Sequence, residues 1–265
     1  MQGQLIAAGA AGANVYRLNM SHSKRDWDRE VVFRIRRKAA ELKANVAILF
    51  DLQGPSIRTG DLLEPYHLKK GDTVEIRLGT AKPELPFSTT VNYDGLLQDV
   101  QAGHTMVVDN GGILMRIAEV RPDRLICDVL TEGVFGSRRH INLPGVALRL
   151  PALTEKDLAD LAVAVECETD YVAMSFVRDA AHIAQLREHI DNLGGKAQIV
   201  AKIEDQQAVR HIDDIILAAD VIMVARGDLG IEVSIEELPI IQRRIVRHCH
   251  RLGRRCIVAT HMLES

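Results

Sequence analysis

The sequence predicts an α/β fold in which parallel strands alternate with helices and a β-rich segment interrupts the alternation. Two observations carry this prediction. On both sides of residues 59–147, short apolar runs alternate with stretches of helical periodicity, as in the strand, helix and strand expected within residues 198–232. Within residues 59–147 the pattern changes to glycine, proline and period-two alternation. Since a strand, a helix and a strand in succession form a right-handed βαβ unit, the alternating parts should build one parallel sheet.

Two strands with a helix between them are expected before the insertion. Residues 4–12 are the tail of a helix that ends at Gly12. A strand at residues 15–18, a helix at 26–43 and a second strand at 46–50 follow. Each strand ends in a dense polar cluster, at residues 17–22 and at residues 51–58. The Gly54-Pro55 step cannot continue a central strand, so the chain should turn there.

The insertion is expected to consist of short strands and turns. Residues 73–78 and 124–130 alternate between apolar and polar side chains, as half-buried strands do. Asn110-Gly111 between apolar runs is the usual signal of a type I′ hairpin, so the local sequence favours a turn role for Asp109 over a catalytic one. Proline and glycine within residues 142–145 suit a hinge back to the main domain.

After the insertion the sequence predicts four strands, each preceded by a helix. The first helix begins with a capping-box-like sequence at residues 154–157 and runs to residue 165, and the second ends at Gly194. The third covers residues 209–219, and the fourth runs from a cap at residues 234–237 to residue 252. The strands occupy residues 171–176, 199–204, 221–224 and 256–259. At roughly 30 residues for each βα unit, about six units fit, whereas a closed barrel needs eight. The chain begins inside a helix and stops after a strand, so we predict a fragment of a longer protein.

Three charged residues stand where two of these strands end, in places that a buried core would not select. Lys202 and Glu204 are two apart and therefore point to the same face of a strand, and Asp228 follows the next strand. Ligands of parallel α/β folds bind at the carboxyl ends of strands, so the three should converge. Two carboxylates beside a lysine suit Mg²⁺ and a transferring phosphoryl group. The alternative is a surface ion pair of Lys202 with Glu204 and a helix-capping Asp228.

Composition excludes several classes of protein. With 265 residues and 47% hydrophobic content, the chain can bury one large core and a small second domain. It has no apolar stretch of membrane-spanning length and no signal peptide, so we expect a cytoplasmic protein without a membrane partner. The net charge of -3 selects no partner class, and the basic face of the last helix lacks the aromatic residues that nucleic-acid binding would add. Four cysteines without CxxC spacing fit reduced thiols.

Five segments together resemble the pyruvate kinase family, in family order and across essentially the whole chain. They are residues 17–22 (RLNMSH), 51–58 (DLQGPSIR), 201–204 (AKIE), 225–230 (ARGDLG) and 259–265 (ATHMLES). The resemblance implies a (β/α)8 TIM-type barrel formed by residues 1–58 and 148–265, with a small β-barrel-like lid domain at residues 59–147. Relative to the family pattern, the first barrel strand with most of its helix, the last strand and a C-terminal regulatory domain are missing.

The resemblance also implies an activity and its partners. The protein would transfer a phosphoryl group from phosphoenolpyruvate to ADP in glycolysis, giving pyruvate and ATP, and the full-length protein would be a homotetramer. Glu204 and Asp228 would bind Mg²⁺ or Mn²⁺. The implied catalytic and substrate-binding residues are Lys202, Arg17, Ala225, Arg226, Gly227, Asp228 and Thr260, of which residues 225–227 would offer backbone N–H groups to the substrate carboxylate. The implied K⁺ ligands are Asn19, Ser21, Asp51 and the carbonyl of Leu52, and the implied nucleotide side comprises Asn19, His22, Arg58 and Asp109.

Two residues depart from the family pattern. Ser56 stands where glutamate is associated with K⁺ dependence and lysine with independence, which leaves the K⁺ requirement open, and Asn110 replaces the usual aspartate after Asp109. One alternative function is a Mg²⁺-dependent lyase of the phosphoenolpyruvate and pyruvate barrel group, which the insertion and residues 51–58 oppose. Another is an inactive binding or assembly fragment, because missing strands would leave open sheet edges.

Overall fold

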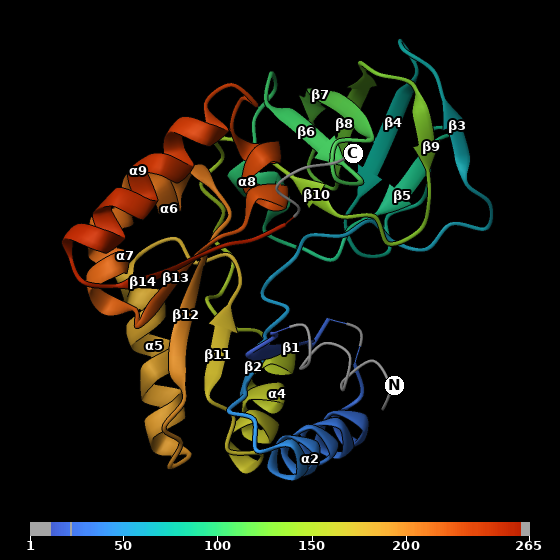
Figure 1. Cartoon of the computed structure of the whole chain (residues 1–265). Helices are drawn as coiled ribbons and strands as arrows, with labels where there is room; N and C mark the ends of the chain where they lie inside the picture. Colours follow the sequence, from blue (N-terminus) through green and yellow to red (C-terminus); the bar gives the residue numbers. More distant parts are fainter. Residues whose placement is uncertain (1–11, 22, 261–265) are drawn as a thin grey trace.

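The computed structural model of the chain describes residues 12–21 and 23–260, and its largest parallel sheet has six strands (Figure 1). In sheet order, which is also chain order, these are β1 (Val15–Asn19), β2 (Ala47–Asp51), β11 (Tyr171–Met174), β12 (Gln198–Ile203), β13 (Val221–Val224) and β14 (Arg255–Val258). The six predicted strands are confirmed, and the curled sheet supplies six of the eight strands of a (β/α)8 barrel. The helix predicted at residues 4–12 lies outside the described residues except for Gly12.

Helices cover the outer face of this sheet (Figure 1). They are α2 (Arg25–Leu42), α4 (Glu155–Glu166), α5 (Ala180–Asn192), α6 (Gln206–Arg210), α7 (Ile212–Ala218) and α9 (Leu238–Arg251), whereas α8 (Arg226–Glu232) lies at the carboxyl ends of the strands, next to the insertion (Figure 1). The strands alternate between two faces: Ile48 and Phe50 of β2 pack into the core under the helices, whereas Leu49 belongs to a smaller cluster on the inner face. Within residues 12–21 and 23–260, no helix is both long and apolar enough to cross a membrane.

Two helices differ from the prediction. The helix expected over residues 209–219 is divided into α6 and α7, because His211 has a non-helical conformation with ψ near 19°. The last helix begins at Leu238 and not at the cap expected in residues 234–237. Pro239 occupies its first turn, where the missing N–H of proline costs no hydrogen bond. The hydrophobic periodicity located both regions but not the residues at which these helices begin.

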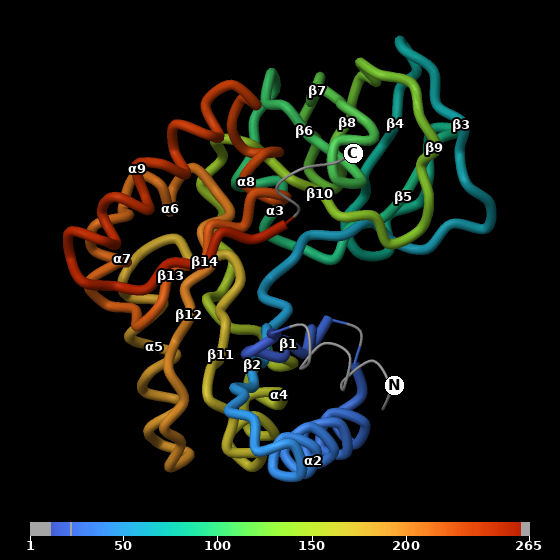
Figure 2. Tube along the Cα trace, in the orientation of Figure 1, coloured from blue at the N-terminus to red at the C-terminus, as the bar shows by residue number. Residues whose placement is uncertain are grey.

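The insertion forms separate sheets with a core of their own. Its elements are β3 (Tyr66–Leu68), β4 (Thr73–Arg77), β5 (Ser88–Thr90), α3 (Leu96–Asp99), β6 (Thr105–Val108), β7 (Ile113–Val120), β8 (Arg124–Val129), β9 (Gly133–Phe135) and β10 (Ile141–Asn142). The predicted hairpin joins β6 to β7: the Gly112 N–H donates to the Asp109 carbonyl, and both Asn110 and Gly111 have positive φ. Figure 2 shows the chain entering the insertion after β2 and returning before α4.

A buried ion pair stabilises the insertion, and its disruption should be costly. Arg124 Nη1 lies 2.8 Å from Glu75 Oε2, and the other Glu75 oxygen accepts backbone N–H groups of Glu84 and Leu85. We expect Arg124→Met to lower the free energy of unfolding by about 3 kcal/mol, since it leaves a buried carboxylate without its closest countercharge. The loss falls at the low end of such cases because Arg77 Nε remains 3.9 Å from Glu75.

Urea unfolding measures this loss. The double variant Glu75→Gln/Arg124→Met removes both charges and should recover part of the stability. A loss below about 1 kcal/mol in the single variant would be typical of an exposed ion pair and would contradict the expectation.

Candidate active site

Polar side chains from the carboxyl ends of the parallel strands and from the insertion line a cavity of about 360 Å³. The strand ends and the segments after them contribute Arg17, Asn19, Ser21, Asp51, Leu52, Gln53, Ser56, Arg58, Ser175, Phe176, Lys202, Glu204 and Asp228, and the insertion contributes Asp109, Asn110, Arg138, Arg139 and His140. Most of the site residues predicted from the sequence are in this set. Of the others, residues 225–227 and Thr260 do not line the cavity, and His22 lies outside the described residues.

The pleat of the strands explains why these side chains meet. Val200 and Lys202 alternate with outward-facing residues of β12, so Lys202 shares the inner face with Val200. Asp51 follows Leu49 on the inner face of β2, and its register partner across the sheet is Asn19 of β1. Parallel strands in register therefore bring their polar ends to one edge of the sheet.

Lys202 contacts acidic and polar side chains in the cavity. Its Nζ lies 2.9 Å from Glu204 Oε1 and 3.2 Å from Asp51 Oδ1, and it donates to Ser175 Oγ at 2.7 Å. Only 8% of Lys202 is exposed, so the alternative of a surface ion pair is wrong. Burial favours the neutral amine, but the charges of Glu204 and Asp51 outweigh it and raise the pKa of Lys202. The cavity therefore holds a fixed positive charge at neutral pH.

Glu204 is buried between this lysine and a backbone amide. Its Oε2 accepts the Phe176 N–H at 2.7 Å, and 2% of the residue is exposed. Burial raises the pKa of Glu204; the Lys202 charge opposes the increase and the Asp228 charge adds to it. Two carboxylates that repel each other are a suitable setting for a divalent cation.

The carboxylates of Glu204 and Asp228 are two donors that could hold Mg²⁺ together with water and substrate oxygens. Over the described part of the chain, no group of three or more His, Cys, Asp or Glu side chains could hold a metal ion. Mg²⁺ keeps several waters and commonly takes one or two carboxylates together with substrate oxygens. Glu204 and Asp228 match that requirement.

Asp51 presents a buried oxygen that is open to a cation. Its Oδ2 receives the Arg17 Nε at 2.5 Å, whereas Oδ1 accepts no well-oriented hydrogen bond from the described residues, although Lys202 lies nearby. Asn19 Oδ1 accepts the Ser21 N–H at 3.1 Å, and Asn19 is the register partner of Asp51. A buried carboxylate oxygen that pairs with Lys202 but accepts no well-oriented hydrogen bond could also bind a monovalent cation.

The loop after β2 is held rigidly against the barrel. Gly54 has φ +71°, and a Cβ there would lie 2.9 Å from both Phe176 Cδ2 and Ser175 Cβ. Its N–H donates to Asp157 Oδ1 at 3.0 Å, and Asp157 also forms the predicted capping box of α4 with Thr154. The glycine and the buried aspartate therefore fix the loop that carries the predicted cation ligands.

Asp228 lies in the first turn of α8, one strand away from Glu204. It is not the helix cap that the alternative interpretation required, because the N-cap is Ala225, which makes no side-chain cap. The Ala225 N–H donates to the Ile203 carbonyl at 3.2 Å. The Ala225 N–H was expected to face a substrate carboxylate, but it already forms a hydrogen bond with β12.

Thr260 lies beside the start of α8 and is exposed. Arg226 donates from Nε to the Ala259 carbonyl at 2.9 Å and from Nη2 to the Thr260 carbonyl at 3.0 Å. A Cβ on Gly227 would lie 3.7 Å from Thr260 Cγ2. The end of β14 and the beginning of α8 are therefore joined through Arg226.

The insertion closes one side of the cavity. Asp109 pairs with Arg139 at 3.3 Å, so it is both a turn residue and a lining residue. The His140 ring packs edge-on against Phe176, with 5.8 Å between centroids, and burial lowers the pKa of His140. Arg58 Nη1 donates to the Arg138 carbonyl at 3.1 Å. These contacts place charged groups of the insertion opposite the strand ends.

Ser175 and His140 are among the lining side chains to which the sequence analysis gave no role. Ser175 connects neighbouring strand ends, because it accepts from Lys202 and donates to the Leu52 carbonyl at 2.8 Å. It directly follows β11, so the strand-end rule that identified Lys202 could have identified it too. His140 lies in a loop of the insertion, where no local pattern distinguishes it.

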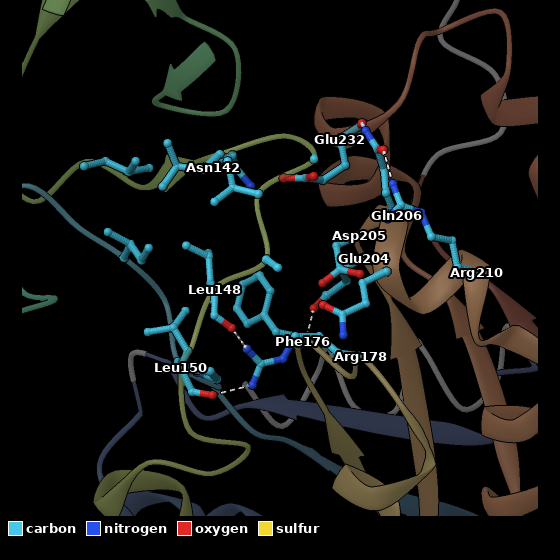
Figure 3. A pocket seen from close by; sticks show the side chains of 18 of the residues that line it. Asn142, Leu148, Leu150, Phe176, Arg178, Glu204, Asp205, Gln206, Arg210 and Glu232 are labelled. Atoms are coloured by element: carbon cyan, nitrogen blue, oxygen red, sulfur yellow. Dashed lines mark hydrogen bonds between the residues drawn. The ribbon is translucent and has the colours of Figure 1, made fainter. Parts of the chain in front are cut away.

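A second cavity, of about 310 Å³, lies where the chain returns from the insertion to the barrel (Figure 3). Arg178 is buried beside it and donates to the carbonyls of Leu148, at 2.6 Å, and Leu150. The Glu232 carboxylate points toward Asn142 across the cavity in Figure 3, and the Asn142 side chain forms a hydrogen bond with it. The return segment and the end of α8 therefore both line this cavity.

Glu232 should make stability depend on pH near neutrality. Burial raises the pKa of Glu232 to about 7, the Asp205 charge adds to the increase, and hydrogen bonds from Asn142 and the Gly145 N–H oppose it. An unfolded glutamate ionises near pH 4.5, so the folded protein keeps this proton longer and loses stability as the pH rises between these values. At about 1.4 kcal/mol for each pKa unit, Glu232→Gln should gain about 3 kcal/mol over the parent near pH 8 and less than about 1 kcal/mol near pH 5.

Urea unfolding of both proteins at the two pH values measures this difference. The glutamine keeps the size of the side chain, so packing changes should be equal at both pH values and cancel in the comparison. A difference between variant and parent that does not change with pH would contradict the assigned burial effect.

Comparisons with known proteins identify the family of this chain. The family described as pyruvate kinase, barrel domain, matches residues 2–265. Plastidial pyruvate kinase 2 of Arabidopsis thaliana is 40% identical over 258 residues, which cover 96% of this chain and 44% of the relative. The pyruvate kinase of Clostridium perfringens is 39% identical over 256 residues, covering 96% and 54%, and that of Geobacillus stearothermophilus is 37% identical over 266 residues, covering 99% and 45%. The chain spans about half the length of the curated relatives that it matches.

Proposed function

This chain belongs to the pyruvate kinase family, and we propose on that basis that its main cavity transfers a phosphoryl group from phosphoenolpyruvate to ADP, giving pyruvate and ATP. The observation that carries the proposal is the buried Lys202, whose ammonium lies within 3.2 Å of both Glu204 and Asp51. Phosphoryl transfer needs positioned charge more than covalent chemistry, and a desolvated lysine beside two carboxylates provides it.

The residues of the cavity divide into substrate-facing and nucleotide-facing groups in this proposal. Lys202 neutralises the phosphoryl group in transit, and Arg17, half of whose side chain is exposed, is available to bind the substrate phosphate. The backbone N–H groups of residues 226 and 227 at the start of α8 would bind the substrate carboxylate. Thr260 would contact the substrate next to Gly227. A Cβ placed on this glycine would lie 3.7 Å from Thr260 Cγ2.

Arg58, Asp109 and Asn19, which line the same cavity, would contact the nucleotide. Closure of the insertion over the strand ends would exclude water from the transferring group. His22, which the family resemblance also assigns to the nucleotide, lies outside the described residues.

The proposed function includes a divalent and a monovalent cation, each assigned to oxygen ligands of the cavity. Glu204 and Asp228 would hold Mg²⁺ or Mn²⁺, which supplies positive charge to the substrate oxygens. Asn19, Ser21, Asp51 and the Leu52 carbonyl would hold K⁺, with Asp51 Oδ1 as its anionic ligand. Ser56 accepts a hydrogen bond from Arg58 at 3.2 Å, and its neutral hydroxyl leaves the K⁺ requirement to experiment. A cytoplasmic location and a homotetrameric full-length protein complete the proposal.

The test is pyruvate formation from phosphoenolpyruvate by the purified chain, with and without ADP, Mg²⁺ and K⁺. We expect pyruvate to form only when ADP and Mg²⁺ are both present, and the K⁺ series shows whether the Asp51 site is needed. Release of pyruvate without ADP would instead identify a lyase and overturn the proposal.

A further inference from the structure

Two of the four cysteines meet in the core between α9 and β14. Cys249 lies near the end of α9 and is fully buried, and Cys256 lies on β14, partly buried against the same core. Gly253, at φ +66°, turns the chain between them, and the Arg254 N–H donates to the Cys249 carbonyl at 2.8 Å. Figure 1 shows the chain reversing from α9 into β14. The turn therefore folds one cysteine back toward the other.

The strand register directs both side chains into one layer. Cys256 pairs across the sheet with Ile222 of β13, which belongs to the core under the helices. On α9, the buried side chains are Cys249 and Ile245, one helical turn apart. Cys249 and Cys256 therefore lie in the same core layer between α9 and β14, where the Cys256 thiol donates to the Ile257 carbonyl at 3.9 Å. A disulfide requires the two sulfurs to approach to about 2 Å.

The two thiols are not equivalent. Cys256 is partly accessible from solvent, and the neighbouring Cys249 thiol lowers its pKa. Cys249 is enclosed, and the neighbouring Cys256 thiol raises its pKa. A partly exposed, more acidic thiol backed by a buried one matches the division between an attacking and a resolving cysteine. Cys127 differs, because burial raises its pKa to about 12 in the core of the insertion.

We propose that Cys249 and Cys256 form a reversible intramolecular disulfide, with a small-molecule disulfide such as oxidised glutathione as the oxidant. The Cys256 thiolate attacks one sulfur of the oxidant, whose S–S bond breaks and releases one glutathione thiolate. Cys249 then gives its proton to solvent, attacks Cys256 Sγ, and expels the second glutathione. Two protein thiols are oxidised, and one glutathione disulfide is reduced to two thiols.

The bond would tether α9 to the beginning of β14. The other end of this strand leads to the Ala259 and Thr260 carbonyls that hold Arg226 of α8. The disulfide would therefore form at one end of β14, and the other end of this strand contacts α8, the helix that carries Asp228. The inference does not require the proposed phosphoryl transfer.

The test treats the purified chain with glutathione buffers of graded potential, traps free thiols by alkylation, and maps the products by tandem mass spectrometry. The parent should lose two alkylatable thiols and yield a peptide linked between Cys249 and Cys256. Cys249→Ser should stop at a stable glutathione adduct on Cys256, and Cys256→Ser should leave Cys249 unmodified because it is enclosed. The equilibrium should favour the bond at least about tenfold more in buffer than in urea, which corresponds to about 30 mV.

Several results would overturn the proposal. These are four free thiols in the folded parent at all buffer ratios, a link from Cys249 to Cys127 or Cys167, or equal glutathione adducts on both serine variants. An equilibrium that is no more favourable in buffer than in urea would equally contradict it, because the fold would then not bring the thiols together. Circular dichroism of each variant confirms that the comparison concerns folded protein.

Discussion

Replacing Lys202 with methionine should reduce phosphoryl transfer by on the order of 10³-fold or more while leaving divalent-cation binding intact. Methionine fills the volume of the lysine stem but removes the charge that lies 2.9 Å from Glu204 and 3.2 Å from Asp51. The loss falls on turnover, since this charge is needed where negative charge moves between oxygens. Glu204 and Asp228 both remain, so Mn²⁺, followed by electron paramagnetic resonance, should bind at least as tightly as in the parent.

The same substitution should also cost stability, by about 3 kcal/mol, because it leaves the buried Glu204 without its countercharge, whereas Asp51 keeps its ion pair with Arg17. The cost should shrink in acid, where the carboxylates can take up protons. Lys196→Met, at an exposed lysine, is the matched control and should change neither property. Turnover within tenfold of the parent by a folded Lys202→Met protein would contradict the role of Lys202.

Glu204→Gln should weaken Mn²⁺ binding by more than the roughly 10- to 100-fold that is typical of residues behind a metal ligand. The amide keeps the shape of the carboxylate and can still accept the Phe176 N–H at the Oε2 position. Its NH₂ group would then face Lys202, which lies 2.9 Å from Oε1. Both the missing charge and this unfavourable contact act at the cation site.

Asp228→Asn should weaken Mn²⁺ binding to a similar extent, because the two carboxylates would share one ion. Glu132→Gln, at an exposed glutamate of the insertion, controls for a general loss of negative charge. Unchanged Mn²⁺ affinity in either Glu204→Gln or Asp228→Asn would contradict the pair as the divalent-cation ligands.

Much of the barrel could be predicted because local pattern and tertiary environment agree there. Continuous apolar runs such as residues 221–224 become buried strands, and the two-residue spacing of Lys202 and Glu204 places both on one face. The capping box at Thr154 and the hairpin at Asn110 follow from short-range hydrogen bonding alone. Such features need only a few neighbouring residues to be recognised.

Other features depend on contacts between distant residues and left no local signal. Asp51 approaches Lys202 from a strand 151 positions earlier in the sequence, since the sheet places β2 and β12 on either side of β11. His140 reaches Phe176 only because the insertion folds back over the barrel. The division of one predicted helix at His211 is likewise invisible in the apolar periodicity, which continues through it.

The claim that this cavity carries out phosphoryl transfer is tested most directly by following phosphorus with ³¹P NMR. With purified chain, ADP and Mg²⁺, we expect the phosphoenolpyruvate resonance to disappear while the γ-phosphate of ATP appears in equal amount, and neither change to occur with Lys202→Met. Inorganic phosphate in place of ATP, or consumption of phosphoenolpyruvate without ADP, would contradict the account. An unchanged spectrum from folded chain that binds Mn²⁺ would contradict the claim that these residues suffice for the transfer.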